Sequence, residues 1–107
     1  MDIALDPAPS NVKQALAALR GIGLVADTDS VEDILAQGGV TATNRLSVDL
    51  LTALPVGDFA QLWRRRKEVR YRTICTKAVE KSDQVRLLRS VGRRKDVEDA
   101  DYLESLR

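Results

Sequence analysis

Glycine and proline residues divide this chain into short stretches, and this punctuation constrains the fold more than any other feature. The breaks fall at 21–23, 38–39, 55–57 and 92. Because glycine ends helices readily and proline interrupts them, most elements between these breaks must be short. A fold of several short elements follows.

Within these stretches apolar residues recur at helical spacing. Helical spacing gives several candidate stripes, of which one is Val12, Ala15, Leu16 and Leu19 and another is Leu46, Leu50, Leu51 and Leu54. Ser30 and Asp58 stand where helix N-caps are expected. No run shows sustained period-2 alternation. Residues 69–79 contain β-branched side chains, but their charged flanks and the lack of a hairpin partner argue against a strand.

These patterns predict an all-α protein, a single compact bundle of five or six short helices. The bundle is expected to occupy residues 10–107. Residues 1–9 contain Pro7 and Pro9 and are expected to form a flexible N-terminal tail.

Two absences limit the chemistry of the chain. It has no histidine and one cysteine, Cys75, which excludes histidine-based triads and disulfides within the chain. We therefore expect no enzyme, no metal site and no cofactor. The acidic, proline-containing start is unlike a signal peptide, and no apolar run approaches the ~20 residues of a membrane span. The expected location is the cytoplasm, with no membrane partner.

The formal net charge of +1 hides three charge blocks. Residues 1–63 hold three bases and eight acids, a net of −5. Residues 64–95 hold thirteen bases and three acids, a net of +10, and residues 96–107 hold one base and five acids, a net of −4. A strongly basic block therefore lies between two acidic blocks.

The basic block predicts a nucleic-acid-binding protein that uses a basic helix, residues 64–77, to contact phosphates. The expected contacts are Arg64, Arg65, Arg66, Lys67, Arg70 and Arg72, with Arg93, Arg94 and Lys95 as a second group. Trp63 and Tyr71 could stack on bases, although Trp63 fits a core anchor better. DNA is favoured over RNA. The alternative is that the acids of the same chain pair with these bases and leave an ordinary solvated face.

Two further hypotheses remain open. The residues around Gly39 resemble the turn of a helix-turn-helix, which would make Thr43, Asn44 and Arg45 base contacts, although an ordinary helical hairpin explains the same pattern. A function from another class is a helical protein-protein interaction or self-associating adaptor module. Its complementary acidic and basic surfaces would bind an acidic protein surface or assemble copies of the chain into a homo-oligomer.

Overall fold

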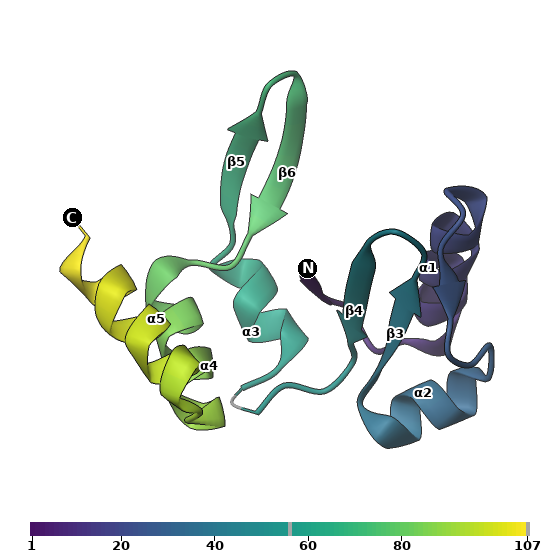
Figure 1. The fold of residues 1–107 in the computed structure, drawn as a ribbon, viewed down its shortest axis with the longest axis horizontal. Helices are drawn as coiled ribbons and strands as arrows, with labels where there is room; N and C mark the ends of the chain where they lie inside the picture. The colour runs from purple at the N-terminus through teal and green to yellow at the C-terminus, as the bar shows by residue number, and fades with distance from the viewer. Residues whose placement is uncertain (56, 107) are drawn as a thin grey trace. The chain divides into compact units, whose positions relative to one another are not determined.

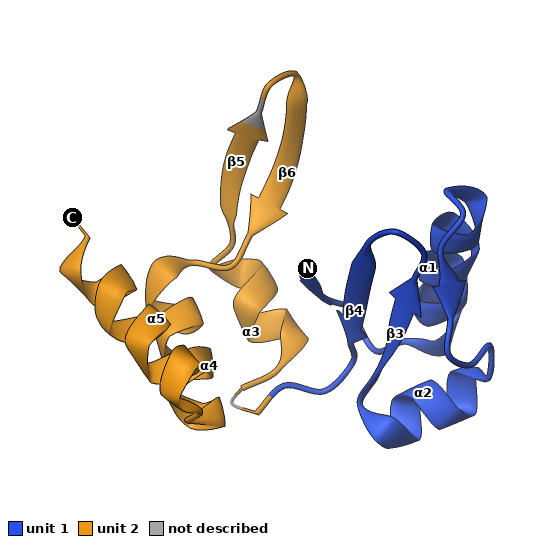
Figure 2. Cartoon of the chain, in the orientation of Figure 1, with its two compact units in different colours: residues 1–54 blue, residues 55–107 orange. Residues whose placement is uncertain are grey.

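The computed structural model describes residues 1–55 and 57–106, and the chain divides into two compact units, residues 1–54 and 55–107 (Figure 2). Both units contain helices and strands (Figure 1), so the all-α bundle predicted from the sequence is wrong. The elements in chain order are β1 (Asp2–Ala4), α1 (Pro9–Gly21), β2 (Val25–Ala26), α2 (Val31–Gln37), β3 (Gly39–Thr43), β4 (Ser47–Leu51), α3 (Phe59–Arg64), β5 (Lys67–Tyr71), β6 (Ile74–Ala78), α4 (Lys81–Val91) and α5 (Arg94–Ser105).

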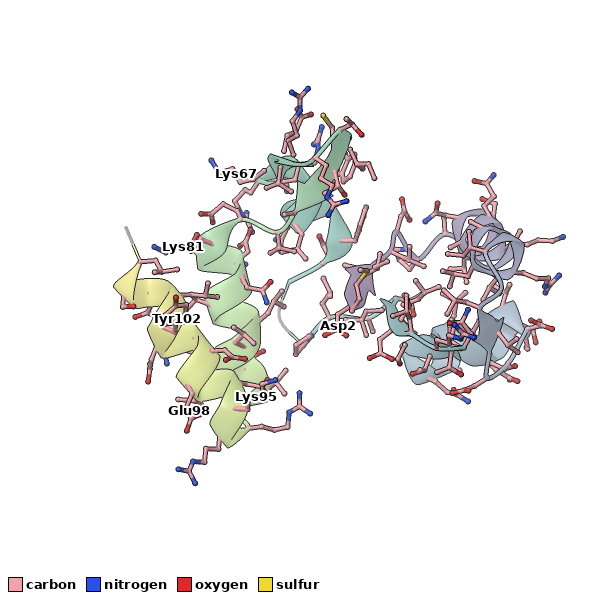
Figure 3. The ribbon with its side chains drawn as sticks, turned by 45° about the horizontal axis from the view of Figure 1, so that its top comes forward. Asp2, Lys67, Lys81, Lys95, Glu98 and Tyr102 are labelled. Carbon is pink, nitrogen blue, oxygen red and sulfur yellow. The ribbon has the colours of Figure 1, made fainter. Side chains whose placement is uncertain are left out.

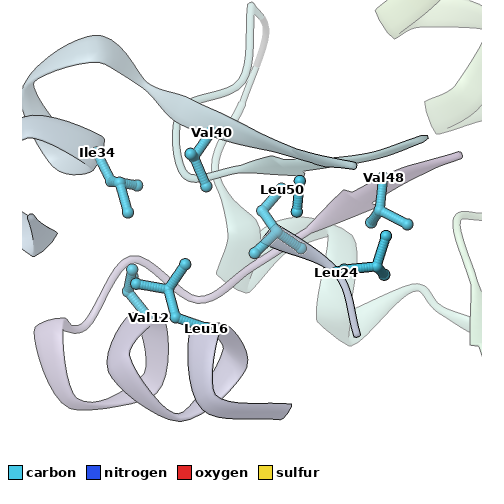
Figure 4. Packing of buried hydrophobic residues seen from close by; sticks show 8 residues of the cluster. Val12, Leu16, Leu24, Ile34, Val40, Val48 and Leu50 are labelled. Carbon is cyan, nitrogen blue, oxygen red and sulfur yellow. The ribbon is translucent and has the colours of Figure 1, made fainter. Parts of the chain in front are cut away.

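The first unit is a four-stranded sheet in the order β1-β4-β3-β2, with α1 and α2 packed on one face. Strand β1 runs parallel to β4, and the other neighbours are antiparallel. One cluster joins both helices to the sheet (Figure 4), and its buried members are Val12, Leu16, Leu24, Ile34, Val40, Ala42, Val48 and Leu50. Residues 2–4, expected in a flexible tail, form the edge strand of this sheet.

The helix expected around Leu46 to Leu54 is instead the hairpin of β3 and β4. Val48 and Leu50 are buried and alternate with more exposed residues, whereas Leu46 lies in the turn and is 72% exposed. Period-2 alternation was therefore present, but each strand is only five residues long. A run of leucines masked it, because their spacing also fits a helix.

The two predicted N-caps, Ser30 and Asp58, are confirmed. The Ser30 hydroxyl accepts a hydrogen bond of 3.2 Å from the Asp33 amide at the start of α2. Asp58 begins α3 with a complete capping box that includes Gln61. Gly92 ends α4 in the left-handed conformation, as its position in the sequence indicated.

The second unit contains α3, a two-stranded antiparallel ribbon formed by β5 and β6, and the paired helices α4 and α5. Figure 1 shows the ribbon projecting from the helices of this unit. The predicted basic helix over 64–77 is therefore wrong, because α3 ends at Arg64 and the chain enters the ribbon at Lys67. Continuing the helix through four consecutive basic residues would bury no apolar stripe.

Candidate nucleic-acid interface

The ribbon, residues 67–78, is the most exposed part of the second unit. Every described side chain from Lys67 to Lys77 is exposed, including Val69 at 42% and Ile74 at 65%. A tight turn at Arg72 and Thr73 joins the strands, and Arg72 adopts a positive φ of 57°. Each strand has five residues and is therefore ~17 Å long.

Strand register sorts the side chains of the ribbon onto two faces. Glu68 lies opposite Lys77, and Arg70 lies opposite Cys75. Directly opposed residues share a face in an antiparallel pair, and residues two apart along a strand share a face as well. Arg70 and Lys77 therefore lie on one face with Glu68, and Val69 lies on the other face.

The segment from α3 into the ribbon is strongly cationic. Residues 64–78 hold seven bases and one acid, Glu68. Within the part of the chain that is described, five of these bases have no carboxylate oxygen within 4.0 Å, and they are Arg64, Arg66, Lys67, Arg70 and Lys77. Their charge is available to an external anion.

Arg65 differs from its neighbours because it holds the root of the ribbon to α4. Its Nε and Nη2 atoms each donate a 2.8 Å hydrogen bond to the carboxylate of Asp83. Arg86 donates a further bond of 2.9 Å to the same group, whose side chain is 5% exposed. The hydrogen bonds from Arg65 hold the pKa of Asp83 below its usual range, against the opposing effect of burial. This bidentate pair fixes where the ribbon begins.

The second predicted group of contacts lies where α5 begins, and two of its three members are paired. Arg93 contacts the buried Asp96 at 2.7 Å, and Arg94 contacts Glu98 at 3.1 Å. Lys95 is exposed beside them on α5, whereas Lys67 lies on the ribbon (Figure 3). Arg89 of α4 is likewise paired, with Asp101 and Glu104 at 2.9 Å each. The acidic C-terminal block therefore neutralises much of the basic charge of its own helix pair.

The three residues predicted as base contacts lie in the first unit, at the exposed turn between β3 and β4 and not on a recognition helix. The side chain of Asn44 is occupied by structural bonds. Its Nδ2 donates to the Gly23 carbonyl at 3.1 Å, and its Oδ1 accepts from the Leu46 amide at 2.9 Å. The structure therefore does not join Thr43, Asn44 and Arg45 to the ribbon in one compact unit.

Two residues have roles at this site that the sequence did not predict. Asp83 lies eighteen residues from its partner Arg65, and no local spacing indicates such a pair. Trp63 is not a core anchor, because it is 43% exposed and stacks on Phe59 with ring centroids 5.8 Å apart. In the sequence, the position of Trp63 directly before the basic run 64–67 was the signal that could have placed it at this site. The side chain of Tyr71, the other predicted stacking residue, lies outside the described part of the structure.

No family model, no curated protein and no solved structure matches this chain. Over the described residues, no helix combines the length and apolar character needed to cross a membrane. The same residues contain no group of three or more histidine, cysteine, aspartate or glutamate side chains placed to hold a metal ion.

Proposed function

We propose that this protein binds nucleic acid, and that the ribbon is the element that enters a groove of duplex DNA. The observation that carries the proposal is the contrast in charge pairing within the second unit. Arginines of α4 and α5 are matched with carboxylates, whereas Lys67, Arg70 and Lys77 of the ribbon form no ion pair with a described residue. Unmatched cations on a projecting element attract phosphates and release the counterions condensed on them.

The dimensions of the ribbon favour the major groove of DNA. This groove is ~12 Å wide and ~8.5 Å deep and admits a two-stranded β-ribbon. The ribbon is ~17 Å long and thus exceeds the depth of the groove. A-form RNA has a deep, narrow major groove that side chains cannot read, so DNA is the favoured partner.

Specific residues take specific roles in this proposal. Arg70 and Lys77 contact phosphates or base edges from one face of the ribbon, and Lys67 contacts the backbone. Arg64 and Arg66 extend the positive surface to the end of α3. Arg65 keeps its structural bond to Asp83 and is not assigned a contact.

A binding measurement at several salt concentrations tests the proposal. A labelled short DNA duplex is titrated with the wild-type chain, with Arg70→Gln, and with Lys13→Gln as an equal charge change on exposed α1. We expect Arg70→Gln to weaken binding. The fall of log affinity with log salt should also become shallower by about 0.9, because one phosphate contact is lost. Lys13→Gln is expected to bind like the wild type. No binding at low salt, or equal effects of the two variants, would reject the proposal.

A second candidate function is self-association through the ribbon. Both strands of the ribbon have an unpaired edge in the described structure, and Val69 and Ile74 are exposed. Edges of this kind pair with another chain. Joining two cationic ribbons is opposed by repulsion, so higher salt should strengthen this assembly, whereas it weakens binding to DNA. Mass measurement in solution at low and high salt separates the two functions.

A further inference from the structure

Two cations from different elements meet at the indole ring of Trp63. The guanidinium carbon of Arg66, just after α3, lies 4.0 Å from the ring centroid. The ammonium nitrogen of Lys77, on β6, lies 5.7 Å from the same centroid. Both charges are therefore within the ~6 Å over which the face of an aromatic ring attracts a cation.

The two cations share one aromatic ring, and neither forms an ion pair with a described carboxylate. Among the residues that the structure describes, no carboxylate oxygen lies within 4.0 Å of Arg66 or Lys77. Glu68 lies across from Lys77 in the strand register, yet it forms no ion pair with it. Two like charges on one ring repel each other, and a bound anion would relieve that repulsion.

The Arg66 guanidinium is held in place, and most N–H donors of Arg66 and Lys77 remain without an acceptor among the described residues. Nη1 of Arg66 donates a 2.8 Å hydrogen bond to the Trp63 carbonyl, which orients the guanidinium. A guanidinium carries five N–H donors and an ammonium carries three, so most remain open to a ligand. Phe59 stacks on Trp63 at an interplanar angle of 21° and holds the ring from its own helix.

We propose that Arg66 and Lys77, held by Trp63, form a clamp for one phosphate group of the nucleic-acid backbone at the root of the ribbon. This inference rests on the proposed function and adds a defined phosphate site to it. Trp63 is a positioning residue, because it holds the two cations and does not stack on a base. The clamp sets the register with which the ribbon enters the groove.

The single tryptophan of the chain makes the clamp directly observable. Wild-type protein is titrated with duplex DNA while Trp63 emission and the anisotropy of the labelled duplex are followed together. We expect the emission to change in step with binding, because a phosphate held by both cations alters the charge beside the indole. Lys77→Gln should lose most of the change in Trp63 emission. It should also make the slope of log affinity against log salt shallower by about 0.9. Lys67→Gln makes an equal charge change on the opposite face of the ribbon. It should also make the salt dependence of binding shallower, but it should keep the change in Trp63 emission.

Substitution of Trp63 tests the positioning role by anisotropy alone. Trp63→Phe keeps an aromatic face and should bind nearly as the wild type does, whereas Trp63→Leu should bind more weakly. Binding with unchanged Trp63 emission, together with identical behaviour of Lys77→Gln and Lys67→Gln, would overturn the clamp and leave the proposed function intact. A wild-type chain that binds no duplex would overturn the proposed function and the clamp with it.

Discussion

Gly39 is the position in the first unit at which a side chain would meet the backbone of the neighbouring strand. A Cβ atom there would lie 2.4 Å from the carbonyl oxygen of Leu50, which is far inside van der Waals contact. We predict that Gly39→Ala destabilises the first unit by about 1–3 kcal/mol, because β3 and β4 must separate to make room.

Gly21 supplies the matched control for this prediction. A Cβ atom at Gly21, in the last turn of α1, meets nothing within 4 Å. Gly21→Ala should therefore leave the midpoint of urea unfolding unchanged or raise it slightly. Equal midpoints for the two variants, measured by circular dichroism, would show that the approach of β3 to β4 is not tight.

Asp83 has the corresponding importance in the second unit. Its carboxylate receives hydrogen bonds from Arg65 and Arg86 and is almost completely buried. We predict that Asp83→Asn lowers the urea midpoint reported by Trp63 emission, because the neutral amide cannot match both oxygens to the guanidinium of Arg65. Asp99→Asn removes an exposed acid of α5 that forms no ion pair with a described residue, and it should have no effect. If Asp83→Asn and Asp99→Asn lower the urea midpoint equally, the loss of stability comes from the change in net charge and not from the bonds of Asp83.

At the scale of elements, the helix ends that the sequence predicted correctly are those with signals inside a few residues. The Ser30 cap with α2, the Asp58 cap with α3 and the glycine that ends α4 all act locally. The strands depend on partners that a local pattern does not identify. Strand β1 pairs with β4, which lies more than forty residues away in the chain.

Distant partners do not explain why the sequence failed to predict the ribbon, because its two strands are adjacent in the chain. Strand prediction depends on one face being buried, and both faces of the ribbon are exposed. Its basic composition was plain in the sequence and indicated the residues that the proposed interface uses. Which of them are occupied by ion pairs, as Arg65 is, required the structure.

The one acid of the ribbon gives a prediction at this scale. Glu68 lies on the same face as Arg70 and Lys77, so its charge opposes an approaching phosphate. Glu68→Gln should tighten binding to duplex DNA about two- to threefold. This is the effect expected from removing the partly screened repulsion between one carboxylate and a phosphate bound at a neighbouring residue. Glu32→Gln, on exposed α2 of the first unit, is the control and should leave affinity unchanged. Weaker binding by Glu68→Gln would mean that Glu68 orders the cations beside it.

At the scale of the whole molecule, the two units are stabilised by different kinds of buried group. The first has a core of eight buried apolar residues. The buried apolar residues described in the second are Leu62, Val85 and Ala100, and the carboxyl groups of Asp83 and Asp96 are buried with them. The stability of the second unit therefore depends more strongly on ionised carboxylates, and this difference should appear as a difference in response to acid.

Hydrogen bonds from Arg65 and from Arg93 lower the pKa values of Asp83 and Asp96 respectively, and Arg86 and Lys95 add attraction to the ionised forms. A carboxyl group with a lowered pKa in the folded state binds fewer protons than it does unfolded. Its stabilisation is complete above the ordinary value of ~3.9 and is lost as the pH falls through that value toward the lowered pKa.

Urea unfolding at about pH 7 and at about pH 3 measures this difference, with Trp63 emission reporting the second unit alone and circular dichroism reporting both. We expect acid to move the Trp63 transition to lower urea and to separate it from the transition of the first unit. The variant with both Asp83→Asn and Asp96→Asn should be less stable at neutral pH and should lose most of this acid shift. A Trp63 transition that moves no further than that of the first unit would show that these carboxylates do not set the stability of the second.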